Sequence, residues 1–188
     1  MNSTIMNKSD TNALDQVIGV LKQKKLVILP CDTIYGIIGL APDTYETLVS
    51  IKKRPNEKHF IHYVTFEMLA RMTPMNIDDA LLALWPGKVT FLVYDHQRNK
   101  ISLRIPDDRF LHSILTEVGQ PLYTTSVNIT GKTPLTDIQQ MVEKFHRSVD
   151  LFIETQDTLD EHPSTILDLT TTPYTLIRQG SVDVSSFM

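Results

Sequence analysis

A short apolar run that ends in a polar turn, within residues 26–39, constrains the fold of this chain most. The sequence there is LVILPCDTIYGIIG, in which four apolar residues lead into Pro30 and the polar turn at residues 31–33. A run this short, rich in branched residues and bounded by turn signals, is typical of a buried strand. Because ligands of open α/β sheets bind beside the C-terminal ends of strands, the turn is a candidate ligand-binding position. Taken alone, the stretch is better explained as an ordinary exit from strand to loop.

Apolar periodicity in the rest of the chain predicts alternating helices and strands. Helices are predicted after Asp10 or Thr11, after a capping-box pattern at Asp43 and Glu46, and over residues 65–72, 76–85, 110–118 and 136–145. Further strands are predicted over residues 60–64, 89–94, 100–105, 122–126, 151–153, 165–169 and 175–178. This alternation predicts one α/β domain over residues 1–188, built on a twisted mixed β-sheet flanked by helices, with residues 1–12 as a flexible N-terminal segment.

Composition and charge exclude several classes of protein. The chain is 41% hydrophobic and contains one cysteine, which favours a soluble protein of the reducing cytoplasm, and no apolar run suggests a signal peptide or a membrane span. The net charge of −4 argues against a protein that coats nucleic acid over its whole surface. Residues 22–58 nevertheless carry seven Lys or Arg against four Asp or Glu, which is compatible with a local anion site. A solvated basic face would look similar.

Several apparent motifs fail on inspection. Gly131-Lys132-Thr133 imitates the end of a phosphate-binding P-loop, but Ser126 stands where that motif needs glycine. His59 and His62 lie three residues apart on a predicted strand, so they point to opposite faces and are poor joint metal ligands. No base is predicted near Cys31, and a lone buried thiol is usually inert. We therefore predict no metal site formed by protein side chains alone.

Two stretches carry polar or charged groups at the ends of predicted elements. Lys52, Lys53, Arg54 and Lys58 gather where a helix ends. Cations also stabilise the C-terminal turn of a helix, so this run has a purely structural explanation as well as a role in binding an anionic ligand. The stretch 124–128, TTSVN, ends a strand with hydroxyls and an amide that can hydrogen-bond a small polar molecule or cap a turn.

Seven segments, in order, are similar to the motifs of the YrdC family of threonylcarbamoyl-AMP synthases in its compact single-domain form. They are PCDTIYGIIGLAPD, KKRPNEK, WPGKVT, SLRIPDD, TTSVNITG, PSTILDLT and LIRQG. The resemblance begins near residue 13 and runs to the C-terminus. It differs from the family pattern at Cys31, where threonine is usual, and at His59-Phe60, where proline and leucine are usual.

The resemblance implies a YrdC-like fold with a concave, positively charged cleft, and an enzyme of the nucleotidyltransferase class. The implied reaction converts L-threonine, bicarbonate and ATP into threonylcarbamoyl-adenylate and pyrophosphate. The product would feed the threonylcarbamoyl modification of the tRNA adenosine beside the anticodon. The implied partners are the tRNA-modification proteins that use the adenylate, with weak binding of tRNA or other RNA also expected. Mg²⁺ is expected to accompany ATP, held by the triphosphate rather than by a protein motif.

The resemblance also implies roles for individual residues. Lys52 and Arg54 would be catalytic. The L-threonine pocket would be lined by Thr33, Tyr35, Lys58, Thr124 and Ser164. The residues that would contact ATP are Lys52, Arg54, Arg104, Ser126, Asn128 and Arg178.

Two other functions stay open at this point. One is an RNA-binding protein with the YrdC fold and no synthase activity, in which cations would contact phosphate backbones. The other is a YrdC-like enzyme that forms a different adenylate. The paired Lys52 and Arg54, together with Ser126 and Asn128, favour the synthase because a nonspecific RNA binder needs charge rather than this placement.

Overall fold

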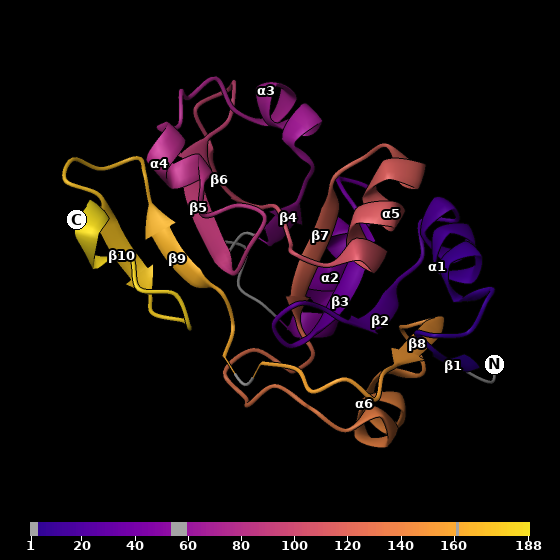
Figure 1. The fold of residues 1–188 in the computed structure, drawn as a ribbon. Helices are drawn as coiled ribbons and strands as arrows, with labels where there is room; N and C mark the ends of the chain where they lie inside the picture. Colours follow the sequence, from indigo (N-terminus) through magenta and orange to yellow (C-terminus); the bar gives the residue numbers. More distant parts are fainter. Residues whose placement is uncertain (1–3, 54–59, 161) are drawn as a thin grey trace.

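A single mixed sheet organises the computed structural model, which describes residues 4–53, 60–160 and 162–188 (Figure 1). In the described residues, ten strands lie side by side in the order β1-β8-β2-β3-β7-β4-β6-β5-β9-β10. The strands are β1 (Thr4–Asn7), β2 (Val27–Pro30), β3 (Tyr35–Leu40), β4 (Ile61–Tyr63), β5 (Val89–Tyr94), β6 (Lys100–Arg104), β7 (Leu122–Ser126), β8 (Leu151–Glu154), β9 (Thr165–Asp168) and β10 (Thr175–Arg178). The predicted α/β class and mixed sheet are confirmed.

Helices lie between the strands. They are α1 (Ala13–Lys22), α2 (Tyr45–Lys52), α3 (Leu69–Met72), α4 (Asp79–Leu82), α5 (Arg109–Val118), α6 (Ile138–Phe145) and the 3₁₀ turns η1 (Phe66–Met68) and η2 (Ser185–Phe187). The helix predicted over residues 76–85 is much shorter in the structure. Its end tightens because the amides of Leu84 and Trp85 bond to carbonyls three residues back.

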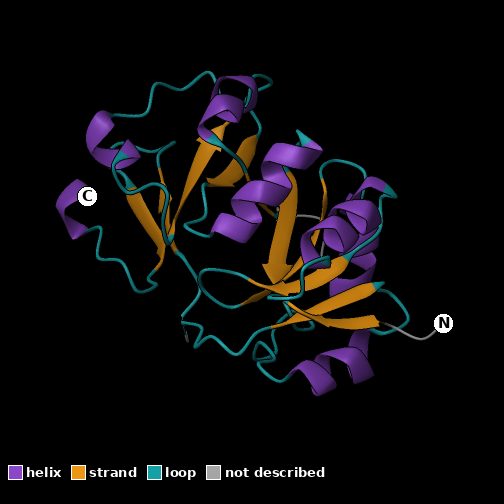
Figure 2. Ribbon diagram, turned by 45° about the vertical axis from the view of Figure 1, so that its right-hand side comes forward, coloured by secondary structure: helices purple, strands orange, loops and turns teal. Residues whose placement is uncertain are grey.

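Helices cover both faces of the sheet near its β1 end, as Figure 2 shows. On one face, α1 and α5 pack together over β2 and β3 through a cluster that includes Val17, Leu21 and Ile114. On the other face, α2 and α6 pack through a cluster that includes Leu48 and Met141. A third cluster lies under α4 and joins β5, β6 and β9. The apolar stripes read from the sequence therefore face three separate parts of the core.

The caps of the first two helices differ from the predicted ones. Helix α1 follows Asn12, which makes no side-chain cap, while the Asp10 carboxylate accepts a hydrogen bond from the Asn7 amide at 2.9 Å. Helix α2 follows Thr44, whose hydroxyl donates to the Leu40 carbonyl at 2.9 Å. In both places the polar side chain stabilises the preceding turn instead of the helix.

The N-terminal segment expected to be flexible contains a strand. Residues 4–7 form β1, which pairs in parallel with β8 at one edge of the sheet. Just beyond it, Lys8 forms an ion pair of 2.7 Å with Asp108 at the start of α5. These contacts connect the described N-terminus to both the sheet and a helix.

Asp108 gives the first testable prediction. Its carboxylate caps α5 by accepting a hydrogen bond from the Leu111 amide at 2.9 Å. We expect Asp108→Ala to lower the free energy of unfolding by about 1–2 kcal/mol, because an unpaired amide then remains at the helix start. Urea unfolding followed by circular dichroism measures this. Asp108→Asn keeps a capping oxygen and should lose less; equal losses in the two variants would contradict the capping role.

Candidate active site

A cavity of about 250 Å³ lies over the middle of the sheet. It is lined by Thr33, Ile34, Tyr35, Gly36, Ile61, Tyr63, Ser102, Arg104, Thr124, Thr125, Ser126, Pro134, Pro163, Ser164, Ile166 and Arg178. The strand register explains why these residues meet: on β4, Ile61 pairs with Thr124 of β7 on one side and with Ser102 of β6 on the other. Side chains two residues apart on a strand share a face, so Arg104 lies on the same side as Ser102.

The cavity brings together seven of the residues that the resemblance singled out. They are Thr33, Tyr35, Arg104, Thr124, Ser126, Ser164 and Arg178. Lys52 and Asn128 are not among its lining residues but contact Ser126 from beside it. Arg54 and Lys58 lie outside the described residues.

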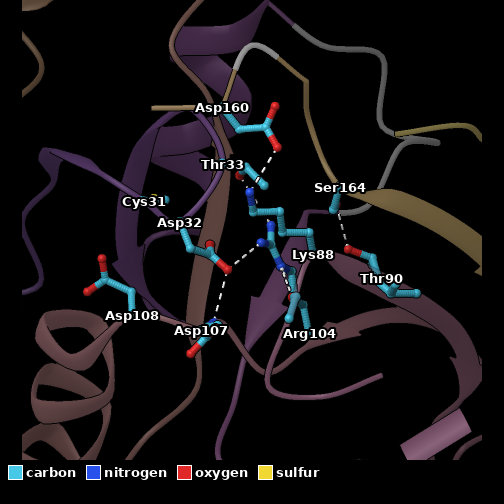
Figure 3. A network of polar contacts seen from close by, with 12 residues as sticks. Cys31, Asp32, Thr33, Lys88, Thr90, Arg104, Asp107, Asp108, Asp160 and Ser164 are labelled. Carbon is cyan, nitrogen blue, oxygen red and sulfur yellow. Dashed lines mark hydrogen bonds and ion pairs between the residues drawn. The ribbon is translucent and has the colours of Figure 1, made fainter. Parts of the chain in front are cut away.

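Arg104 is fixed at one wall of the cavity and is only 2% exposed. Its guanidinium forms an ion pair of 2.6 Å with Asp32 and donates to the Gly87 carbonyl at 2.9 Å and to the Thr33 hydroxyl at 3.3 Å (Figure 3). It also lies 5.6 Å from the centre of the Tyr63 ring. These contacts hold the guanidinium plane in one orientation.

Asp32 is the partner of Arg104 that the sequence analysis missed. Its Oδ2 accepts hydrogen bonds from Arg104 and from the Asp107 amide, the latter at 2.9 Å, whereas its Oδ1 is buried with no hydrogen bond from the described residues. Burial raises the pKa of Asp32, and the nearby Arg104 charge counteracts part of that rise. Asp32 lies inside the PCDT segment that carries the resemblance, so its position was a usable signal.

Arg178 faces the same cavity from the last strand, β10. Its guanidinium donates to the Ser164 carbonyl at 2.9 Å and to the Ser164 hydroxyl at 3.1 Å. The Ser164 hydroxyl is in turn 2.8 Å from the hydroxyl of Thr90, which is fully buried (Figure 3). Burial lowers the pKa of Arg178, and the charge of Arg104 lowers it further, so the two cations lie close enough to repel each other.

Lys52 connects the end of α2 to the end of β7. Its side chain is 3% exposed, and its ammonium group donates to the Ser126 carbonyl at 2.6 Å and to the Asn128 side-chain oxygen. The Ser126 hydroxyl also bonds to that same Asn128 oxygen, at 2.9 Å. The structure thus joins the KKRPNEK segment to the TTSVN segment through one buried cation.

The remaining predicted pocket residues differ in their contacts. The Thr33 hydroxyl accepts from Arg104, and the Tyr35 hydroxyl accepts from the Thr155 amide at 3.3 Å. Thr124 is 5% exposed and its hydroxyl would lie 2.9 Å from a Cβ atom placed on Gly36. A glycine at position 36 therefore leaves room for the cavity next to Thr124.

Cys31 gives a second testable prediction. The thiol is 2% exposed, and burial raises its pKa to about 12, with a further contribution from the charge of Asp32. Because the thiolate is the reactive form, we expect no labelling by iodoacetamide in the native protein at pH 8 and rapid labelling in urea. Mass spectrometry measures both, and the chain has only this cysteine. Fast labelling of the native protein would contradict a buried, protonated thiol.

Two structural features are absent from the described part of the chain. No group of three or more His, Cys, Asp or Glu side chains lies close enough there to hold a metal ion. None of the described helices is both long and apolar enough to cross a membrane. His62, one of the two histidines considered above, lies against Ser102 and the Tyr123 ring, and His59 is outside the described residues.

Comparison with curated proteins identifies relatives of known name. The chain is 26% identical over 185 residues to a threonylcarbamoyl-AMP synthase of Vibrio vulnificus, covering 89% of this chain and 98% of the relative. The chain is also 25% identical over 179 residues to a threonylcarbamoyl-AMP synthase of Pyrococcus abyssi. That match covers 87% of this chain and 53% of the longer relative.

Solved structures share the fold. P. abyssi Sua5 in complex with L-threonine superposes with a TM-score of 0.87 at 22% identity, covering 98% of this chain and 59% of Sua5. Escherichia coli YciO superposes with a TM-score of 0.84 at 20% identity over the full length of both chains. A family model, Sua5/YciO/YrdC, described as "Telomere recombination", matches residues 19–180. With the model spanning most of the chain and the fold shared throughout, this protein belongs to the Sua5/YciO/YrdC family.

Proposed function

We propose that this protein is a threonylcarbamoyl-AMP synthase. It would convert L-threonine, bicarbonate and ATP into threonylcarbamoyl-adenylate and pyrophosphate, for modification of the tRNA adenosine beside the anticodon. The observation that carries the proposal is the convergence of Arg104, Arg178 and eight hydroxyl-bearing side chains on one cavity. The Vibrio vulnificus relative, which bears the synthase name and is matched over 98% of its length, supports it.

The composition of the cavity suits the reactants. L-Threonine offers a hydroxyl, an amino group and a carboxylate, and ATP offers phosphate oxygens. Hydroxyls of Thr33, Thr124 and Ser164 can act as donors or acceptors to the amino acid. Arginine presents a planar set of donors that matches phosphate oxygens, so Arg104 and Arg178 suit the nucleotide. We assign Tyr35 to the amino-acid pocket, and Ser126 and Asn128 to the adenylate.

The chemistry requires two anions to approach each other. The threonine amine first combines with bicarbonate to give a carbamate and water. A carbamate oxygen then attacks the α-phosphorus of ATP, the bond from that phosphorus to the β-phosphate oxygen breaks, and pyrophosphate leaves. Cations screen the repulsion and stabilise charge that develops during displacement. We assign this work to Lys52, with Arg54 and Lys58 from the same sequence segment.

A divalent cation fits this reaction through the substrate. The described residues that line the cavity supply hydroxyls and guanidinium groups but no carboxylate, and the carboxylate of Asp32 lies beside them with its Oδ2 bonded to Arg104, so they form no set of Mg²⁺ ligands. Mg²⁺ would be held by the triphosphate of ATP, where it would neutralise charge on the leaving pyrophosphate. We further propose that the protein acts in the cytoplasm and passes its adenylate to tRNA-modification proteins.

Pyrophosphate release tests the proposed function. We expect purified protein to release pyrophosphate from ATP only when L-threonine and bicarbonate are both present, and each single omission should reduce release to background. Substituting L-serine for L-threonine tests whether the pocket distinguishes the extra methyl group. Faster pyrophosphate release with another amino acid than with L-threonine would indicate an enzyme that forms a different adenylate.

An absence of pyrophosphate release from folded protein would overturn the synthase proposal. Binding of a fluorescent single-stranded RNA would then be measured by anisotropy over a range of salt concentrations. Affinity that falls steeply with salt would favour the RNA-binding alternative, because phosphate contacts release counterions. Weak RNA binding together with full pyrophosphate release would instead fit a synthase that also contacts tRNA.

A further inference from the structure

A buried carboxylate holds one of the two cavity arginines in place. Asp32 is nearly buried, contacts Arg104 at 2.6 Å through Oδ2, and is itself fixed because that oxygen also accepts from the Asp107 amide at 2.9 Å (Figure 3). We propose that Asp32 is a positioning residue for Arg104: it orients the guanidinium toward the ligand and cancels its net charge. Its effect on turnover rests on the proposed function; its effect on Arg104 does not.

The hydrogen bonds of Arg104 show which of its N–H donors remain available to a ligand. A guanidinium has five N–H donors. Three of them are used by described protein groups, namely the Asp32 carboxylate, the Gly87 carbonyl and the Thr33 hydroxyl. The three partners come from separate parts of the chain, so they fix the plane as well as the position of the group. The remaining two donors are therefore held in a set direction before any ligand binds.

The local net charge around Arg104 therefore differs from that around Arg178. The positive charge of Arg104 is cancelled by the negative charge of Asp32, because the two form an ion pair. Little solvent screens this pair, since both side chains are at most 5% exposed. In the described part of the chain, Arg178 forms no ion pair, and its contacts are with the oxygens of Ser164. Arg178 therefore supplies the attraction for an anion, while Arg104 supplies direction. Without Asp32, the cavity would be lined by two cations that form no ion pair with the described residues.

This division of roles predicts an unusual outcome for Asp32→Asn. The asparagine oxygen can take the place of Oδ2 and accept the same hydrogen bonds, so the variant removes the negative charge while keeping the shape. One extra positive charge then remains in the cavity. We expect ATP to bind at least as tightly as to the wild type in calorimetry, while turnover falls about tenfold because a neutral amide oxygen holds the Arg104 guanidinium less firmly than a carboxylate does. A general loss of structure would instead weaken ATP binding and lower turnover together.

A double-mutant comparison tests whether Asp32 acts through Arg104. Arg104→Gln removes the guanidinium, and in that background Asp32→Asn should change turnover by less than about twofold. Asp108→Asn serves as the matched control, because it removes another nearby carboxylate that does not contact Arg104, and its turnover should stay within about twofold of wild type. A further loss of turnover when Asp32→Asn is added to Arg104→Gln would overturn the proposal.

A measurement without substrate separates this inference from the proposed function. The guanidinium N–H signals of Arg104 in ¹⁵N NMR spectra are assigned by their loss in Arg104→Gln. We expect them to be sharp and slowly exchanging in the wild type and broadened in Asp32→Ala, with a smaller effect in Asp32→Asn. Unchanged signals in both Asp32 variants would overturn the positioning role. A wild-type protein with these signals but no pyrophosphate release would reject only the synthase.

Discussion

Lys52→Met is expected to lower pyrophosphate release about 100-fold to 1,000-fold, the usual range for removing one stabilising charge or donor from a reaction site. Methionine keeps most of the buried stem but removes the ammonium group that bonds to Ser126 and Asn128. The end of β7 would then lose the cation that connects it to α2. Steady-state release of pyrophosphate with all three substrates measures the effect.

The neighbouring lysine provides a matched control. Lys53 is the exposed C-terminal cap of α2, whereas Lys52 is buried. Lys53→Met removes the same charge one residue away and should change turnover by less than about twofold, because an exposed charge in water is strongly screened. Turnover should be compared at a temperature where unfolding curves show both variants to be folded. Equal losses in the two variants would contradict a specific role for Lys52.

Gly180→Ala is expected to disturb the site through the backbone of residues 163–165, which border the cavity. A Cβ atom at residue 180 would lie 2.3 Å from the Pro163 carbonyl oxygen and 2.5 Å from the Thr165 amide nitrogen. These are backbone atoms, so the clash is relieved only by moving the chain beside Ser164, which anchors Arg178. We expect the free energy of unfolding to fall by about 1–3 kcal/mol. We also expect turnover to fall about 100-fold, because small displacements at a reaction site are costly.

A glycine-to-alanine substitution at a position where a Cβ atom meets no neighbour provides the control for this prediction. On α1, Gly19 is exposed and a Cβ atom there would meet nothing within 4 Å. Gly19→Ala should therefore raise the free energy of unfolding by about 0.5–1 kcal/mol and leave turnover unchanged. Urea unfolding and pyrophosphate release distinguish the two variants. A Gly180→Ala protein with wild-type stability and turnover would show that the backbone at residues 163–165 adapts without cost.

Local sequence signals were sufficient for most of the elements. Strands β5, β7 and β10 have the predicted bounds, because alternating or continuous apolar runs between turn residues leave few other conformations. Helix ends were harder: the side chains of Asp10 and Thr44 had nearby backbone groups to bond that no helical pattern reveals. For α4, the predicted length was wrong because its last turn tightens before residue 86.

The candidate site was predicted as a set of residues but not as an arrangement. Seven of the residues implied by the family motifs line one cavity, and Lys52 and Asn128 meet beside it. The role of Asp32 was missed because its partner Arg104 lies 72 residues away, and nothing in either local pattern indicates that the two side chains meet. No sequence signal gives the distance between two such groups.

What the sequence by itself determined is therefore most of the elements, their apolar faces and the family motifs, all of which depend on residues close together in the chain, whereas β1 was missed because it is a strand only through its pairing with the distant β8. Only the tertiary structure decided the strand order, in which β7 lies between β3 and β4 and β6 follows β4. That order depends on pairings between distant segments, and it aligns Thr124, Ile61 and Ser102 across three strands. The cavity exists because of this lateral register, since side chains from neighbouring strands converge only when the strands are paired.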